Sequence, residues 1–464
     1  MAEIKVEKRV ERARYKPGRL GKSAEFAKYS RWNIKNTNLK ANVWPEDATC
    51  TDDCKVSSSA KNRSICNLEL ASTALLGDRL YINGGIINKK ETTNGSPFFK
   101  RSTLHRLLWI DLDKIFHWDN PPIGSIEKPK EIRDLFHAGT FVMDADTELL
   151  HTFGGYKWAD DASMNNTAVV TQGLWLYNAT ASLTERWVPK IVSTSWNPLP
   201  KAGGMQWASD GETGVAYGMG GSENAEIEFR SKDRSWKKMM STNPRTINTG
   251  GFLHHIPVGS RTTGSLILFG GEDRDRRNRG PSKMNSMSNI WIYDTQNDVW
   301  HKQTAIGSTE LSDIPDERSL GCSVVAPAPD NSSINIYVYG GTSQNYMDFV
   351  SMPANASHGM KVALKDDIWV LSIPSFTWTK VHEGSKSLGS FKMSCQRLGR
   401  YMVSVGGSHG SYSAGETCKE PINVFDLESL TWNHKKWDSN SDYQVPRVIS
   451  NVIGGRTAAV LGKA

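Results

Sequence analysis

Six β-rich runs along this chain each end in a pair of glycines, and this internal repeat constrains the fold more than any other feature. The second glycines of the pairs are Gly85, Gly155, Gly221, Gly271, Gly341 and Gly407. A chain of 464 residues with 40 glycines should contain about three adjacent pairs by chance. Chance does not place every pair after a run of aliphatic and aromatic residues. A repeated β-rich unit predicts a propeller or another array of similar units.

Each unit contains the material for four strands. One strand precedes the strand that ends in the glycine pair, and a third and a fourth strand follow it. The third and fourth strands end near tryptophans, which are Trp118, Trp187, Trp236, Trp300, Trp378 and Trp432. Glycine at a strand end permits positive φ and close backbone approach, and tryptophan supplies a large apolar face between stacked sheets. We therefore predict an all-β fold, a six-bladed β-propeller with four antiparallel strands per blade.

The chain divides into three parts. Residues 1–49 read as a basic, disordered extension in which WNIKNTNLKANVW could add an outer strand to a blade. Residues 50–437 hold the six blades. Residues 438–464 form a linker and a short C-terminal helix, in which Pro446 and Gly454 mark the start and the stop. Residues 1–40 carry twelve Lys and Arg against four Glu, so the net charge of +7 belongs to the extension and the blades are close to neutral. A near-neutral propeller gives no reason to expect nucleic-acid binding.

The diglycine, the variable loop and the tryptophan together resemble the kelch repeat. The later blades resemble fungal, chiefly ascomycete, kelch-repeat proteins, in the stretches FLHHIPVGSRTTGSLILFGG, MSNIWIYDTQNDVW, ERSLGCSVVAPAPDNSSINIYVYGG, KDDIWVLSIPSFTW and YQVPRVISNVIGG. In that subgroup the propeller is usually an extracellular domain followed by a membrane helix, so the resemblance implies a cell-surface location. This sequence has no run of ~20 apolar residues and no apolar core behind its basic start. The residues themselves predict neither a membrane span nor a signal peptide.

An enzyme of the galactose-oxidase type is the least favoured interpretation. Its copper site needs two imidazoles and two tyrosinates that converge on the ring axis. The eleven histidines are scattered, and the adjacent pair His254 and His255 should point to opposite faces of one strand. The chain also lacks the acidic and histidine string with which related plant proteins hold ferrous iron, a nucleophile elbow and a P-loop. We predict no catalytic residue, no metal site and no cofactor.

The favoured interpretation is a non-catalytic scaffold that binds a protein partner. Long insertions follow the diglycines of four blades, and insertions at one position of a repeat emerge on one face. Aromatic and arginine side chains dominate interface hot spots. The candidate contacts in these loops are Phe98, Phe99, Tyr156, Trp158, Arg274, Arg276, Arg277, Arg279, Tyr346 and Phe349. The alternative is a propeller that binds carbohydrate or cell wall, in which the same aromatics would stack on sugar rings.

Six cysteines are spaced without a C-x-x-C motif, so a zinc site is not indicated. We expect Cys322 to pack as a small buried hydrophobe. The resemblance implies an oxidising compartment, and there we expect a bridge between Cys395 and Cys418.

Overall fold

The fold is described from a computed structural model. It describes residues 66–93, 96–118, 120–132, 135–142, 148–158, 168–170, 174–182, 185–190, 203–210, 214–221, 225–230, 235–239, 249–258, 264–273, 283–309, 313–343, 364–384, 389–408, 422–432, 436–437 and 442–454. All of them belong to one compact unit, Ile34–Ala464. The separate unit Met1–Asn33 and the predicted extension 1–49 lie outside the described residues.

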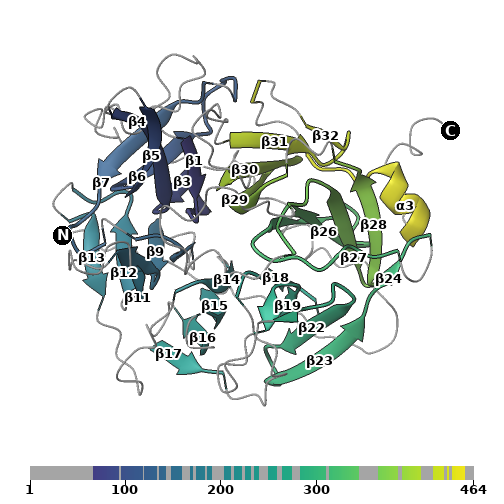
Figure 1. Cartoon of the computed structure of the whole chain (residues 1–464). Coiled ribbons are helices and arrows are strands. Elements are labelled where there is room, and N and C mark those ends of the chain that lie inside the picture. The colour runs from purple at the N-terminus through teal and green to yellow at the C-terminus, as the bar shows by residue number, and fades with distance from the viewer. Residues whose placement is uncertain are drawn as a thin grey trace, which may run out of the picture. The chain divides into compact units, whose positions relative to one another are not determined.

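The described residues form six antiparallel sheets, each built from four strands in sequence order around a common axis (Figure 1). Blade 1 contains β2 (Ser72–Leu76), β3 (Arg79–Asn83), β6 (Arg106–Asp111) and β7 (Ile123–Glu127). Blade 2 contains β8 (Gly139–Phe141), β9 (Leu149–Phe153), β12 (Leu174–Asn178) and β13 (Trp187–Lys190). Blade 3 contains β14 (Met205–Asp210), β15 (Val215–Gly220), β16 (Ala225–Arg230) and β17 (Ser235–Lys238).

The second half of the chain repeats this plan. Blade 4 contains β18 (Phe252–Ile256), β19 (Ser265–Phe269), β22 (Asn289–Asp294) and β23 (Val299–Thr304). Blade 5 contains β25 (Cys322–Pro327), β26 (Ile334–Tyr339), β27 (Ile368–Ile373) and β28 (Thr377–His382), with β24 (Ile306–Gly307) added in parallel along β28. Blade 6 contains β29 (Phe391–Leu398), β30 (Tyr401–Ser408), β31 (Ile422–Asp426) and β32 (Thr431–Trp432). The all-β propeller predicted from the repeat is confirmed.

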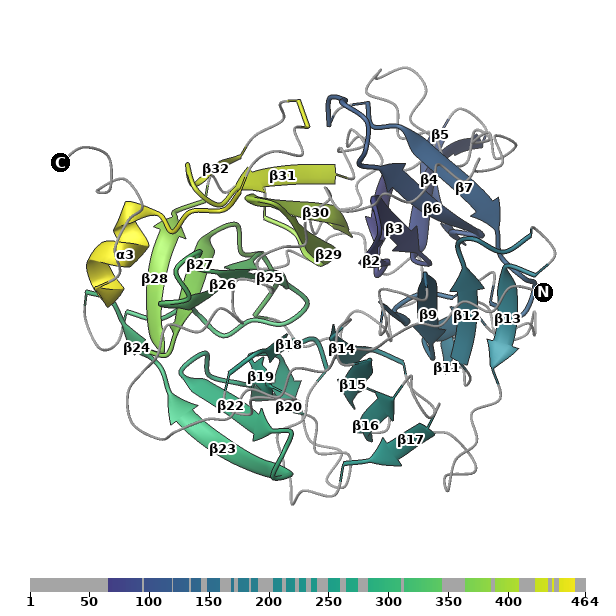
Figure 2. The ribbon, with the colours of Figure 1, turned by 180° about the vertical axis from the view of Figure 1, so that it is seen from behind.

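Further elements extend the blades. The strands β1 (Cys66–Glu69), β4 (Ile86–Thr93) and β5 (Ser96–Thr103) form a small sheet of their own. Two short hairpins pair β10 (Tyr156–Trp158) with β11 (Ala168–Val170) and β20 (Glu272–Asp273) with β21 (Lys283–Met284). The helix α3 (Arg447–Ile453) begins after Pro446, ends at Gly454 in the left-handed conformation, and lies at the outer edge of the ring beside β28 (Figures 1 and 2). In the described part of the chain no helix is long and apolar enough to cross a membrane.

The core is divided into layers, one between each pair of neighbouring blades. The tryptophan of each blade lies in the layer shared with the preceding blade, so Trp118 packs between blades 6 and 1 and Trp236 between blades 2 and 3. Trp187, Trp300, Trp378 and Trp432 occupy the corresponding layers. Trp378 is fully buried, and its indole N–H donates to the carbonyl of Met287 in blade 4 at 2.9 Å. The predicted position of the tryptophans between sheets is therefore observed.

The diglycines have the backbone conformation that was expected of them, since both glycines of every pair have positive φ. At Gly341 (φ 94°) a Cβ would lie 2.8 Å from the carbonyl oxygen of Ser319, just ahead of the first strand of blade 5. A side chain here would collide with the backbone and strain its own φ together.

Two details of the first blade differ from the sequence reading. The residues ahead of the glycine pair of blade 1 do not form one continuous first strand, because Leu70, which has φ 55°, separates β1 from β2. Trp118 lies before β7 rather than on it.

The cysteine pairing also differs. Cys395 on β29 bonds to Cys322 on β25, so the expected bridge from Cys395 to Cys418 is wrong. Cys322 is buried in a hydrophobic cluster as expected, but as one half of a disulfide. The two cysteines are 73 residues apart in sequence, but each lies on the first strand of its blade, and neighbouring first strands meet at the axis. The number of residues between two cysteines along the chain does not show that Cys322 and Cys395 are close together in space.

Candidate functional site

The connections between the second and third strands of the blades all leave the ring on one side, because consecutive antiparallel strands alternate in direction. Three of these connections continue as strand pairs beyond the diglycine. They are β4 with β5 in blade 1, β10 with β11 in blade 2 and β20 with β21 in blade 4. In blade 5 the carbonyl of Gly341 accepts a hydrogen bond from Lys365 N–H at 2.9 Å, which closes the base of the longest connection. This side of the ring, here called the loop face, carries the described members of the predicted contact set.

The structure places only part of the predicted contact set. Phe98 and Phe99 lie on β5, and Tyr156 and Trp158 lie on β10. Residues Arg274, Arg276, Arg277, Arg279, Tyr346 and Phe349 lie outside the described residues. The four placed residues thus come from the extended connections of blades 1 and 2, which are neighbours in the ring.

Tyr156 has a structural role at the base of its loop. Its ring is 9% exposed and stacks on Phe136 with the ring centroids 5.8 Å apart. Its hydroxyl donates to the carbonyl of Gly203, at the entrance to blade 3, at 3.2 Å. A Cβ at residue 203 would lie 2.5 Å from the tyrosine ring, so glycine is needed for this contact. Tyr156 therefore fixes the loop of blade 2 against the neighbouring blade.

A set of residues with positive φ around the axis of the ring was not predicted from the sequence. Six residues at the start of the first strands have positive φ, and they are Leu70, His137, Gly204, Gly250, Leu320 and Lys392. Each lies at the equivalent place in its blade, and backbone N–H groups donate to the carbonyl of the equivalent residue next door at five of the six junctions, with N···O distances of 2.7 to 3.3 Å. Neighbouring first strands are thereby held within hydrogen-bonding distance around the axis. Four of these residues are not glycine, so no sequence signal marks them.

A buried ion pair lies beside this ring of left-handed residues. Lys392 Nζ contacts Glu69 Oε2 at 3.0 Å, and both side chains are buried. Burial, with a further contribution from the positive charge of Lys392, lowers the pKa of His137 to about 4. The imidazole is thus neutral at physiological pH.

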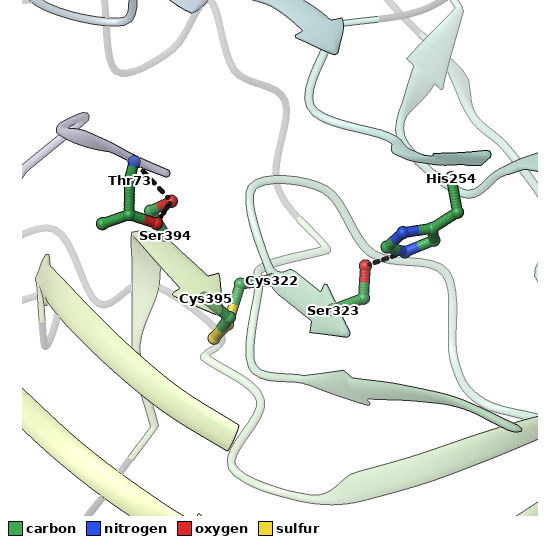
Figure 3. Close-up of a disulfide and its surroundings, with 6 residues drawn as sticks. All are labelled: Thr73, His254, Cys322, Ser323, Ser394 and Cys395. Carbon is green, nitrogen blue, oxygen red and sulfur yellow. Dashed lines mark hydrogen bonds between the residues drawn. A yellow bond between two sulfur atoms is a disulfide. The ribbon is translucent and has the colours of Figure 1, made fainter. Parts of the chain in front are cut away.

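Polar contacts between first strands continue along the axis (Figure 3). The hydroxyls of Thr73 and Ser394 are 2.7 Å apart and join blades 1 and 6. His254 Nε2 lies 2.7 Å from Ser323 Oγ and joins blades 4 and 5. The disulfide between Cys322 and Cys395 joins blades 5 and 6. The walls of the axis therefore serve to attach blades to one another.

The two adjacent histidines point in different directions, as predicted. His254 faces Ser323 in blade 5, whereas His255 stacks on Tyr217 in blade 3, with the ring centroids 6.1 Å apart. Burial lowers the pKa of His254 to about 4. Within the described ranges, no three His, Cys, Asp or Glu side chains are grouped so that they could hold a metal ion.

Comparisons with known proteins agree with this architecture. No protein-family model matches the chain. A kelch repeat-containing protein of the ascomycete Arthroderma benhamiae is 28% identical over 240 residues, which are 46% of this chain and 33% of that protein. Host cell factor of Drosophila melanogaster is 25% identical over 320 residues, which are 65% of this chain and 18% of that protein. The alignments thus span a third or less of the length of these relatives.

Among solved structures, that of YjhT superimposes with a TM-score of 0.51 and 14% identity, covering 81% of this chain and 99% of that one. At this identity the likeness concerns the fold alone. With the two relatives, it supports a kelch-repeat β-propeller.

Proposed function

We propose that this chain is a non-catalytic interaction scaffold whose loop face binds a protein partner. The observation that carries the proposal is the extension of β4–β5, β10–β11 and β20–β21 beyond the diglycines on the same side of the ring. Ordered strand pairs present side chains with little loss of conformational entropy on binding, which favours affinity. The names of the two relatives are those of kelch-repeat and host-cell-factor proteins, and neither names a reaction.

The interblade disulfide supports a location outside the reducing cytosol. Disulfides persist in oxidising compartments, and Cys322–Cys395 lies within the folded core of the ring rather than at a loop tip. We propose that the scaffold works at the cell surface or in the extracellular space. A partner there would be a protein, and the aromatic residues of the loop face would also suit a glycan.

Loop exchange tests the binding face. Replacing residues 346–358 with a short Gly-Ser linker should leave the melting temperature within a few degrees of the wild type, because the base of this loop is closed by Gly341 and Lys365. Recovery of a partner by pull-down should fall. The matched control shortens a turn between first and second strands on the opposite side, at residues 329–332 of blade 5, and should bind as the wild type does.

Two results would contradict this proposal. One is undiminished partner binding after every loop on the loop face has been shortened. The other is one copper or iron ion per chain in elemental analysis, together with oxidation of a sugar alcohol. A glycan array with the same variants separates a protein partner from a carbohydrate ligand.

A further inference from the structure

In each blade the four strands come from one continuous stretch of the chain and follow one another in sequence order, from β2, β3, β6 and β7 in blade 1 to β29–β32 in blade 6. Within the described residues, no strand from one end of the chain completes a sheet from the other end. The first and last blades must therefore be joined by side-chain and loop contacts. The segment that follows blade 6 makes those contacts at the outer part of the junction.

Trp437, five residues after the last strand, is buried between blades 6 and 1. Its indole N–H donates to the carbonyl of Leu112 at 2.8 Å, and its backbone N–H donates to the carbonyl of Phe116 at 2.7 Å. The ring is 1% exposed and lies edge-on to Trp118, with the ring centroids 5.7 Å apart. It also contacts Tyr401 of blade 6 at 6.2 Å between centroids, so it fills the space between the two blades.

The next described residues, from 442 onward, lie at the junction between blades 5 and 6. Tyr443 lies only six residues beyond Trp437, yet its hydroxyl is 3.1 Å from that of Tyr337 in blade 5. In α3, Ile449 is fully buried and packs in the layer between blades 5 and 6. The helix lies beside β28 in both views of the ring (Figures 1 and 2). This C-terminal segment thus contacts blades 1, 5 and 6.

We propose that residues 436–437 and 442–453 form a strap that closes the propeller ring in place of a shared strand. Near the axis the junction between blades 6 and 1 is held by hydroxyl and backbone contacts such as Thr73 with Ser394 (Figure 3). At its outer part the junction depends on the strap. Displacement of Trp437 opens this junction selectively, because blades 5 and 6 remain linked by Cys322–Cys395.

Hydrogen exchange of the full chain carrying Trp437→Ala tests the strap. Peptides from β6–β7 and β31–β32, the outer strands of the junction, should exchange at least about tenfold faster than in the wild type, while peptides from β15 and β19 keep their rates. The matched control is Trp378→Ala, which removes a tryptophan buried between blades 4 and 5. It should speed exchange in β19 and β26 and spare β6.

A milder variant keeps the test decisive if Trp437→Ala fails to fold. Trp437→Phe retains an aromatic ring beside Trp118 but loses the indole donor to Leu112, and it should give a smaller increase confined to the same peptides. Two outcomes would overturn the strap. One is an equal acceleration in all six blades with either variant. The other is an acceleration restricted to residues 436–454.

Discussion

Cys322 and Cys395 are bonded across the junction between blades 5 and 6, each on the strand nearest the axis. Ser323 and Ser394, their immediate neighbours, make polar contacts to blade 4 and blade 1, respectively. The first strands of four successive blades are therefore tied together at one level of the axis, by one covalent bond and two hydroxyl contacts. A ring held in this way keeps the bases of its loops at fixed distances from one another.

Cys395→Ser should lower the free energy of unfolding by ~2–5 kcal/mol, because the bridge closes a long loop in the unfolded chain. Chemical denaturation of the non-reduced protein measures the loss. Mass mapping without reduction should recover a peptide pair that contains Cys322 and Cys395. Recovery of Cys395 bonded to Cys418 would contradict the pairing.

Gly341→Ala should destabilise the fold by ~2 kcal/mol or more, because the new Cβ meets the Ser319 carbonyl and the backbone keeps positive φ. Gly77→Ala is the matched control, since Gly77 also has positive φ (55°) but nothing lies within 4 Å of its added Cβ. The control should lose only ~1 kcal/mol, the strain of the backbone alone. Equal losses in thermal melts would mean that the close approach at Gly341 is unimportant.

The glycine pairs and tryptophans predicted the propeller because their physical roles are local: a strand end with positive φ and an apolar face beside the next sheet. The axis could not be predicted in the same way. Leu70, His137, Leu320 and Lys392 adopt positive φ because equivalent strands converge on the axis, and nothing in their side chains favours that conformation.

The candidate site shows the same limit. Tyr156 was predicted from its residue type and loop position, but the contacts with Phe136 and Gly203 that bury it come from segments far away in sequence. Cys322 and Cys395 lie close together because their blades are neighbours in the ring, and the spacing of the cysteines along the chain does not show this. The remaining predicted contacts of the loop face stay predictions.

Acidification should destabilise the protein between pH 6.5 and about 4. The pKa of His254 is about 4 in the folded state because of burial, so the unfolded chain binds more protons in this window. The stabilisation is fully present above pH 6.5 and is lost as the pH falls toward 4. His254→Gln should reduce the loss between pH 7 and 5 by on the order of 1 kcal/mol, since the imidazole is partly accessible to solvent. If thermal melts of this variant show the same dependence of stability on pH as the wild type, the prediction is refuted. His137→Gln should further reduce the dependence of stability on pH in the same window.

The stability of blade 5 should depend strongly on the ion pair between Arg318 and Asp367. The guanidinium is fully buried, and its Nη1 donates to Asp367 Oδ1 at 2.8 Å. Burial alone would raise the pKa of Asp367, but the hydrogen bonds from Arg318 and Trp369 outweigh it and hold the pKa below its usual value. The pair's contribution is therefore present above about pH 4 and is lost as the pH falls further.

Asp367→Asn should cost ~3–5 kcal/mol at pH 7, because it leaves the Arg318 charge buried without a counter-charge. It should also flatten the decline of stability below pH 4. The control Arg318→Met with Asp367→Leu removes both charges and should recover much of the loss, since two apolar side chains of similar size leave no buried charge unpaired. Urea denaturation at pH 7 and pH 3 distinguishes these outcomes. A double variant no more stable than Asp367→Asn would show that the geometry of the pair, rather than its charge balance, holds the third strand of blade 5 to the entrance of its first.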